Sequence, residues 1–256
     1  MPEGDTIFKA AQRFREALAG KRVVRLAIPV HGAGAPAADV AVDASVTTVE
    51  SHGKHLWIAF DDGRALHVHL GMHGVAHVVG PGSAVPKSAR AVIDVGDAIA
   101  ICRRAPVVEL LDARRMTPRH LGPDLLDPAP DIDEAVRRAR LLDPSTPVGV
   151  ALLDQRVAAG IGNVYKSEVL FARRVDPFAR IGDLTDGTLG ALLRTAAAML
   201  AANVGPGRRT TVPGGLAVYR RAGRACLRCR TLIRSQRLGE HARSTYWCPA
   251  CQTVSE

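Results

Sequence analysis

The sequence predicts an α+β fold: an N-terminal helix, then a β-sandwich or barrel, then a helical region that ends in a cysteine-rich module. Three observations support this prediction. Apolar residues recur at helical spacing at the start, short β-branched runs fill most of the first half, and two pairs of cysteines lie near the end. The chain has 256 residues, which is enough for two domains.

The first expected element is an amphipathic helix. Charged residues separate apolar ones that recur at intervals of three or four: Ile7, Ala11, Phe14 and Leu18. The helix is expected to begin just after Gly4 and to end near Gly20.

Strands are expected next, from Val23 to Leu111, because short apolar runs alternate there with Gly, Pro and Asp. The clearest runs are Val46–Glu50, His55–Phe60, Ala65–Leu70, Ala91–Val95 and Ala98–Cys102. Many short strands at this spacing are typical of a sandwich or barrel.

The second half is expected to be mostly helical. Residues 122–147 are rich in proline and are interpreted as a linker around one short helix, 133–140. The later expected elements are helices over 148–159, 164–174 and 188–203, a loop over 205–215 and a strand over 216–220. We therefore divide the chain into 1–121, the linker 122–147, a helical domain 148–215 and a cysteine module 216–256.

Four cysteines predict a zinc site at the C-terminal end. They form two C-x2-C pairs: Cys226 with Cys229, and Cys248 with Cys251. Thiolates at this spacing are typical of a tetrahedral, structural zinc site with no open position. The alternative, two disulfides, needs an oxidising compartment, for which the sequence gives no argument. The fifth cysteine, Cys102, is interpreted as a core thiol.

The N-terminus carries a candidate nucleophile. Removal of Met1 would expose the secondary amine of Pro2, and an α-amino group has a pKa near ~7.7–8.0, well below that of lysine. Such an amine attacks carbonyl-like carbon to form a Schiff base, and Glu3 would move the protons of that reaction. The alternative is that Pro2 only starts a helix and that Glu3 favours its N-terminus.

Charge predicts an anionic partner. The net charge is +9 and the isoelectric point is near 9.9, so nucleic acid is the first candidate. No signal peptide and no apolar run near ~20 residues is evident, which favours a cytoplasmic protein and no membrane partner. The helix that opens near Gly162 and Asn163 offers a phosphate site at its N-terminus, although these residues taken alone are better explained by ordinary capping.

Taken together, these motifs resemble the formamidopyrimidine-DNA glycosylase and endonuclease VIII family of base-excision repair enzymes, nearest the endonuclease VIII-like proteins of actinobacterial type. The matching segments occur in the family's order along the whole chain: 2–4, 53–56, 69–74, 152–168 and 218–252.

The resemblance implies an N-terminal helix on a β-sandwich, then a helix–two-turns–helix domain with a zinc finger. It also implies a bifunctional DNA glycosylase and abasic-site lyase that acts as a monomer on damaged DNA. The Pro2 amine would attack C1′ of an extruded nucleotide, and β- and δ-elimination would follow. Glu3 would protonate the sugar and shuttle protons. One structural Zn²⁺ is the only cofactor implied.

The resemblance also assigns roles to individual residues. Lys54 matches a lysine that contacts phosphate and transfers a proton during β-elimination, and Arg243 matches an arginine linked to phosphate binding and δ-elimination. Met72 matches a wedge that fills the gap left by an extruded base. Further DNA contacts are expected at the helix end and before the finger: Asn163, Gly162, Lys166 and Arg221. Solvated or capping side chains are the alternatives at these positions.

Several residues depart from the family pattern. Asp5 and Thr6 replace the usual proline and glutamate, 103–107 lacks an aromatic residue, and the loop 208–215 before the finger is short. The last two departures favour oxidised pyrimidines as substrates. Weak activity, the preferred opposite base and the duplex, bubble or single-stranded form of the DNA are left open. The rival interpretations are a zinc-finger DNA-binding protein with weakened catalysis and, less consistent with the length, a tautomerase-like enzyme.

Overall fold

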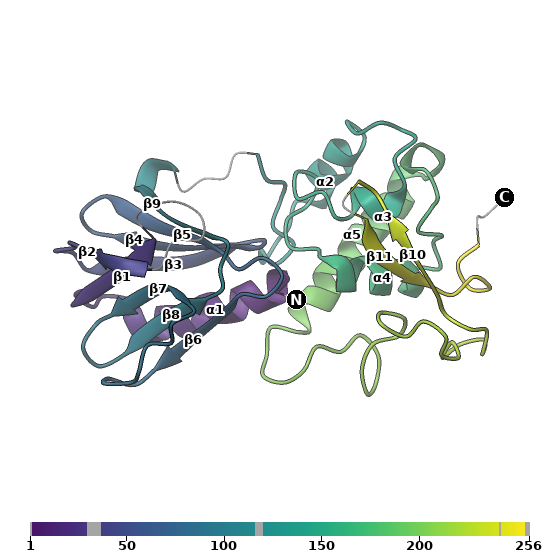
Figure 1. Ribbon diagram of the computed structural model, residues 1–256. Helices are drawn as coiled ribbons and strands as arrows, with labels where there is room; N and C mark the ends of the chain where they lie inside the picture. Colours follow the sequence, from purple (N-terminus) through teal and green to yellow (C-terminus); the bar gives the residue numbers. More distant parts are fainter. Residues whose placement is uncertain (1, 30–36, 116–119, 241, 254–256) are drawn as a thin grey trace. The chain divides into compact units, whose positions relative to one another are not determined.

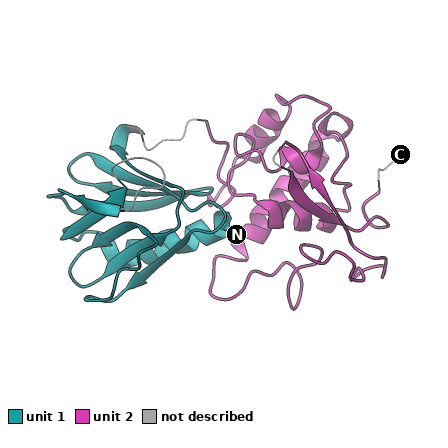
Figure 2. Cartoon of the chain, viewed as in Figure 1, with its two compact units in different colours: residues 1–119 teal, residues 120–256 magenta. Residues whose placement is uncertain are grey.

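The computed structural model describes residues 2–29, 37–115, 120–240 and 242–253. The chain forms two compact units, residues 1–119 (unit 1) and residues 120–256 (unit 2), which Figure 2 distinguishes by colour. Helix and sheet content is mixed, and the predicted α+β class is confirmed.

Unit 1 begins with helix α1, Gly4–Leu18. Its apolar stripe is buried, as the periodicity predicts, with Phe14 and Leu18 at most 1% exposed. The helix ends where Ala19 turns extended and Gly20 takes a φ of +74°. Arg15 ties the helix to the neighbouring strand, because its Nε donates to the carbonyl oxygen of Val49 at 2.9 Å.

The described strands of unit 1 form two antiparallel sheets (Figure 1). The first has the order β2-β1-β7-β8-β6 and the second has the order β3-β4-β5-β9. Their bounds are β1 Arg25–Pro29, β2 Ala37–Val40, β3 Val46–His52, β4 His55–Phe60, β5 Arg64–His69, β6 Val75–Val79, β7 Ala89–Asp94, β8 Ile99–Arg103 and β9 Val107–Asp112, and the 3-10 helix η1, Ala113–Arg115, follows.

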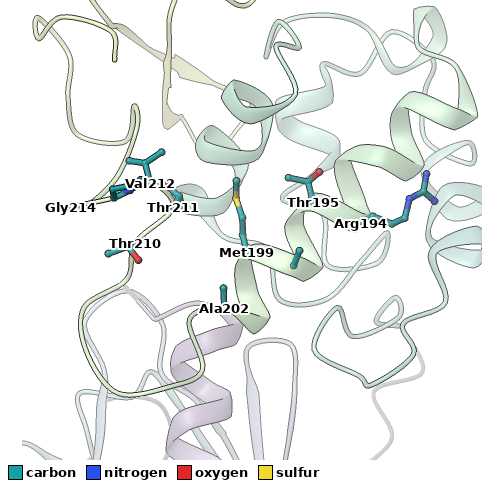
Figure 3. A pocket seen from close by; sticks show the side chains of 10 residues that line it. Arg194, Thr195, Met199, Ala202, Thr210, Thr211, Val212 and Gly214 are labelled. Carbon is teal, nitrogen blue, oxygen red and sulfur yellow. The ribbon is translucent and has the colours of Figure 1, made fainter. Parts of the chain in front are cut away.

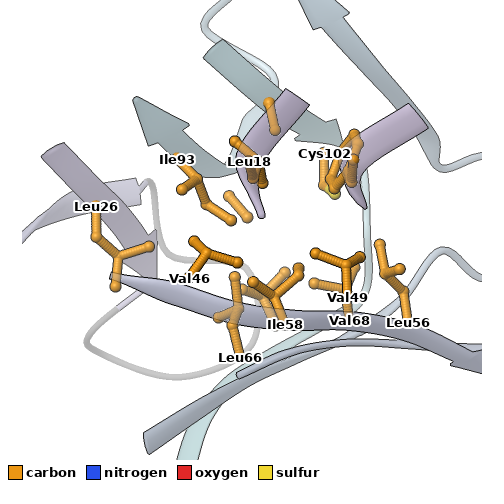
Figure 4. Close-up of a cluster of buried hydrophobic side chains, with 14 of the residues drawn as sticks. Leu18, Leu26, Val46, Val49, Leu56, Ile58, Leu66, Val68, Ile93 and Cys102 are labelled. Atoms are coloured by element: carbon orange, nitrogen blue, oxygen red, sulfur yellow. The ribbon is translucent and has the colours of Figure 1, made fainter. Parts of the chain in front are cut away.

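The larger of two apolar clusters among the described residues of unit 1 joins α1 to strands of both sheets (Figure 4). Inward-facing residues alternate along the strands, as on β4, where Leu56 and Ile58 are fully buried. Cys102 is also buried in this core, and burial raises the pKa of its thiol to about 12. The thiol is therefore a protonated packing group.

Unit 2 contains the remaining helices and one hairpin (Figure 1). The bounds are α2 Ile132–Ala139, α3 Val148–Ala151, α4 Asn163–Ala172, the 3-10 helix η2 Ile181–Asp183, α5 Asp186–Ala201, β10 Arg234–Leu238 and β11 Arg243–Trp247. Residues 122–147, expected as a linker, add Leu125, Ala135 and Ala139 to the core of this unit.

Two expected elements of unit 2 differ from the structure. The helix expected over 148–159 ends at Ala151, and turns follow it. The side chain of Gln155 stabilises these turns, because it donates to the Leu153 carbonyl and accepts from the N–H of Gly160. The strand expected over 216–220 does not form. Three successive backbone N–H groups there point to one carboxylate, that of Glu168, instead of alternating as a strand requires.

Candidate functional site

The start of unit 1 combines a half-buried Pro2 with a buried Glu3. The backbone carbonyl of Glu3 accepts the N–H groups of Thr6 and Ile7, but its side chain makes no capping bond. Capping therefore does not explain why this carboxylate is buried. Met1, whose removal the sequence analysis invokes, lies outside the described residues.

Lys54 occupies the tip of the hairpin between β3 and β4. The turn consists of Gly53 and Lys54, with His52 and His55 as the last cross-strand pair. Gly53 has a φ of +56°, as the first central residue of a two-residue hairpin turn requires. The turn therefore presents a half-buried lysine at the edge of the sandwich.

Met72 lies in the turn after β5 and is 47% exposed. Gly74 closes this turn through its N–H, which donates to the Leu70 carbonyl at 2.9 Å. Gly71 has a φ of +60°, and a Cβ there would lie 2.7 Å from Cγ of Pro106. Both glycines are thus required by the tight geometry that displays the methionine.

His69 at the end of β5 is a residue to which the sequence analysis gave no role. The N–H of Gly71 donates to its Nδ1 at 3.2 Å. Burial, and then the charge of Lys54, lower the pKa of His69, so its neutral form is favoured. With Nδ1 accepting, the neutral ring carries its proton on Nε2 and presents a donor beside Lys54. In the sequence, Gly71 two positions after His69 could have indicated a turn whose N–H bonds to the histidine ring.

His55 on β4 and His67 on β5 pack against each other on one face of the sheet. His55 Nδ1 and His67 Nε2 are 2.8 Å apart, and His67 stacks on Trp57 with ring centroids 4.1 Å apart.

The N-terminal end of α4 is built by Gln155. Its side-chain oxygen accepts from the N–H of Gly160 at 3.1 Å, and its amide donates to the Ile161 carbonyl at 3.0 Å. This brace sets Gly162 as the residue before α4. Asn163 follows, 6% exposed, and its amide donates to the Ser244 carbonyl at 2.7 Å. Its oxygen Oδ1 has no protein partner among the described residues.

Lys166 departs from the expectation of a DNA contact. Its side chain is fully buried, and its ammonium donates to Oγ1 of Thr245 on β11 at 2.8 Å. Because the charge is held inside unit 2, the residue links α4 to the hairpin instead of offering a surface cation. The spacing in the sequence did not reveal this, since the partner lies far along the chain.

The hairpin β10–β11 carries Arg243 at its turn, opposite Leu238 and beside the positive-φ residue Ala242. Arg243 is half-buried. Arg221 precedes the hairpin, and its guanidinium donates to the backbone carbonyls of Ala217 and Ala225. Part of its donor set is thus used to hold the preceding segment.

The four cysteines of the C-terminal module come together. Their sulfur atoms all lie within 4.8 Å of one another, and none is in a disulfide. Bonds of ~2.3 Å to a tetrahedral zinc place sulfur atoms ~3.8 Å apart, and Cys229 lies 3.4 Å from Cys248 while Cys226 lies 4.0 Å from Cys251. The donor set fits one structural Zn²⁺, and the cysteines that would hold it are the four that the sequence predicts: Cys226, Cys229, Cys248 and Cys251.

Glu168 is a second residue that the sequence analysis gave no role. It is 1% exposed on α4, and its carboxylate accepts the backbone N–H groups of Ala217, Val218 and Tyr219 at 2.7 to 2.9 Å. The hydroxyl of Thr211 also donates to it. Only the folded chain brings these donors together, so no local pattern could have found them.

A groove of about 660 Å³ runs between α5 and residues 210–214 (Figure 3). Its lining includes Ala198, Met199 and Val212, with Arg194 at one end. The guanidinium of Arg209, which precedes this segment, lies 4.9 Å from the ring centre of Tyr165 on α4. No helix in the described part of the chain is long and apolar enough to span a bilayer.

Three family models match the chain, each along a different segment. The N-terminal domain of formamidopyrimidine-DNA glycosylase matches residues 1–117, and the H2TH domain of the same enzyme matches residues 121–212. The zinc finger found in FPG and IleRS matches residues 223–254.

Curated relatives and a solved structure agree with these models. A probable endonuclease 8 2 from Streptomyces coelicolor is 41% identical over 98% of this chain and 94% of its own. The DNA-(apurinic or apyrimidinic site) lyase Nei2 of Mycolicibacterium smegmatis is 40% identical over the whole of both chains. A Lactococcus lactis Fpg complexed with DNA that contains an oxidised pyrimidine shares the fold, with a TM-score of 0.83 and 20% identity over 98% of this chain and 100% of that one.

Proposed function

Because the chain belongs to the formamidopyrimidine-DNA glycosylase and endonuclease VIII family, we propose that Pro2 is the nucleophile of its base-excision reaction. The protein is a DNA glycosylase with abasic-site lyase activity that acts in base-excision repair. The observation that carries the proposal is the buried carboxylate of Glu3 directly after Pro2, which does not cap α1.

The Pro2 amine attacks C1′ of the damaged nucleotide, the bond from C1′ to the base breaks, and the base leaves with the proton that the amine loses. The sugar ring opens as its oxygen takes a proton from Glu3, which leaves an iminium between Pro2 and C1′. The iminium acidifies the neighbouring C–H. Loss of that proton expels the 3′ phosphate, and a second elimination expels the 5′ phosphate.

In this proposal, residues of each unit contact the phosphates of the DNA. Lys54 contacts phosphate and transfers a proton in the first elimination, and Arg243 contacts the phosphates that flank the lesion. Asn163 adds a contact at the N-terminus of α4, with the amide hydrogen that Ser244 does not use. Met72, exposed on its turn, fills the space that the extruded base leaves.

We further propose that the substrates are oxidised pyrimidines in duplex DNA. The active form is a monomer, and it acts in the cytoplasm, at the nucleoid. The short segment before the finger supports the choice of pyrimidines. Incision of oligonucleotides with defined lesions, as duplex, bubble and single strand, tests the substrate, and light scattering tests the monomer.

Borohydride trapping tests the nucleophile. Wild-type protein mixed with an abasic-site duplex and borohydride is expected to form a covalent adduct, because hydride reduces the iminium. Pro2→Gly should release little base, and Glu3→Gln should slow base release about 10²- to 10⁴-fold, the range for lost acid–base catalysis.

Glu16→Gln is the matched control, since Glu16 is an exposed carboxylate on the same helix. It should leave trapping and base release unchanged. Full base release by Glu3→Gln, or a working protein whose mass retains Met1, would exclude the proposed chemistry, because a retained methionine turns the Pro2 nitrogen into an amide.

A further inference from the structure

The buried carboxylate of Glu168 is the clearest polar feature of unit 2 that the proposed reaction does not use. Its Oε1 accepts from the N–H groups of Val218 and Tyr219 at 2.9 and 2.8 Å. Its Oε2 accepts from the N–H of Ala217 at 2.7 Å and from the Thr211 hydroxyl. One side chain therefore receives four hydrogen bonds.

No cation of the described residues accompanies these hydrogen bonds. Within the described part of the chain, Glu168 forms no ion pair, although it is 1% exposed. Burial of a polar group is costly unless hydrogen bonds compensate it, and the four bonds supply that compensation. All four donors lie within residues 211–219, so the carboxylate stabilises the conformation of that segment.

The segment that receives these bonds leads directly into the finger. Tyr219 packs edge-on against Tyr246 of β11, with ring centroids 5.1 Å apart. Arg220 has a φ of +58°, so the chain turns sharply there. Arg221 then donates back to the Ala217 carbonyl. The bonds to Glu168 thereby fix the direction in which Arg220 leaves the segment.

The same carboxylate also anchors the other side of the loop. Thr211 begins a tight turn in which its N–H donates to the Gly215 carbonyl at 2.9 Å. Residues of this turn, Val212 among them, form one wall of the groove along α5 (Figure 3). Glu168 therefore holds residues on both sides of the turn 212–215.

We propose that Glu168 is a positioning residue for damaged DNA. It presets the loop 211–219, so that the loop and the arginines that follow it bind the DNA backbone without first being ordered. The inference rests on the proposed function, because it takes this loop as part of the DNA-binding surface. A preformed loop lowers the entropy lost on binding, so the effect should appear in KM and Kd more than in kcat.

Glu168→Gln is the direct test. An amide keeps the shape but offers one oxygen in place of two, so at least one buried N–H loses its acceptor. We expect KM for a lesion duplex, and Kd for a duplex with a tetrahydrofuran abasic analogue, to rise about tenfold, as one orphaned buried donor implies. The turnover number should change by less than about threefold. Amide hydrogen exchange should speed up at Ala217–Tyr219 while α5 stays protected.

Arg140→Gln is the matched control. Arg140 also braces unit 2 by hydrogen bonds, to the carbonyls of Ile181 and Leu184, but it makes none to residues 211–219. It should lower the melting temperature and leave KM and Kd unchanged. If Glu168→Gln does not fold, Thr211→Val replaces it. That variant removes one of the four donors and should raise KM about twofold to threefold.

An unchanged KM and Kd in the folded variant would overturn the positioning role, as would an equal rise in the Arg140→Gln control. Borohydride trapping of the wild type keeps the two proposals apart. A trapped wild type with unaltered binding by Glu168→Gln rejects only the positioning role. Failure of the wild type to be trapped rejects the proposed chemistry, whatever Glu168→Gln does to binding.

Discussion

The two units place their candidate residues differently relative to their cores. In unit 1, Lys54 and Met72 lie on turns at the edge of a sandwich whose interior is apolar. In unit 2, Asn163, Lys166 and the zinc ligand Cys248 are themselves buried and join one element to another. Glu3 is the exception in unit 1, since it is fully buried.

This difference decides what a substitution reports. A turn residue outside an apolar core can change without loss of the fold, so its effect on the reaction is readable directly. A buried polar residue leaves its partners unsatisfied when it is removed, and the penalty falls on stability as well as on function. Substitutions in unit 2 should therefore affect stability most, and substitutions at the edge of unit 1 least.

Removal of zinc should have the largest effect, and it should be confined to unit 2. Structural zinc binds finger peptides with about 10–16 kcal/mol, and that free energy is largely folding free energy. Cys248→Ser should abolish stoichiometric zinc, unfold the β10–β11 hairpin and abolish DNA binding. The melting transition of unit 1 should persist. Metal analysis together with calorimetry checks these outcomes.

Cys102→Ala is the control, because Cys102 lies in the core of unit 1 and outside the metal cluster. It should keep one zinc per chain and lower the stability of unit 1 instead. One equivalent of zinc retained by Cys248→Ser would contradict the ligand set.

The same contrast explains how far the sequence could predict the structure. In unit 1, alternating apolar residues face one core, so the pattern predicted α1 and several strands, with the bounds of β4, His55–Phe60, reproduced. In unit 2, long-range polar contacts override local patterns. The strand expected over 216–220 is lost to the carboxylate of Glu168, and Lys166 turns inward to Thr245.

Zinc is the one long-range feature of unit 2 that the sequence revealed. The spacing of Cys226 and Cys229 is itself a constraint of the metal geometry, so it is visible along the chain. Glu168 has no comparable spacing rule, because its partners are backbone N–H groups that any residue supplies.

At the edge of unit 1, Gly71→Ala should have an intermediate effect. Its φ of +60° is unfavourable for alanine, and the new Cβ would lie 2.7 Å from Cγ of Pro106. We expect a loss of about 1–3 kcal/mol in the free energy of unfolding. Base release should fall further than stability implies, because the turn that carries Met72 shifts. Denaturant titration and single-turnover assays measure the two effects.

Gly82→Ala separates the two causes. Gly82 has a φ of +73°, but nothing lies within 4 Å of its added Cβ. It should therefore show the conformational cost alone, about 1–2 kcal/mol, and normal base release. If both variants behave alike, contact with Pro106 does not shape the Met72 turn.

The smallest expected effect concerns His69, and it sharpens the contrast by leaving the fold intact. Burial, Lys54 and His67 lower the pKa of His69 in the folded protein, whereas the unfolded chain takes up a proton near ~6.5. Below that pH the unfolded state binds more protons, so this residue's contribution to stability is present above ~6.5 and is lost as the pH falls. His69→Gln should match the wild type at pH 7.5 and lose less stability between pH 7.5 and pH 5.5. Parallel melting curves of the two proteins across that range would show that His69 is not held neutral by its surroundings, and the inference that its Nε2 presents a donor beside Lys54 would fail with it.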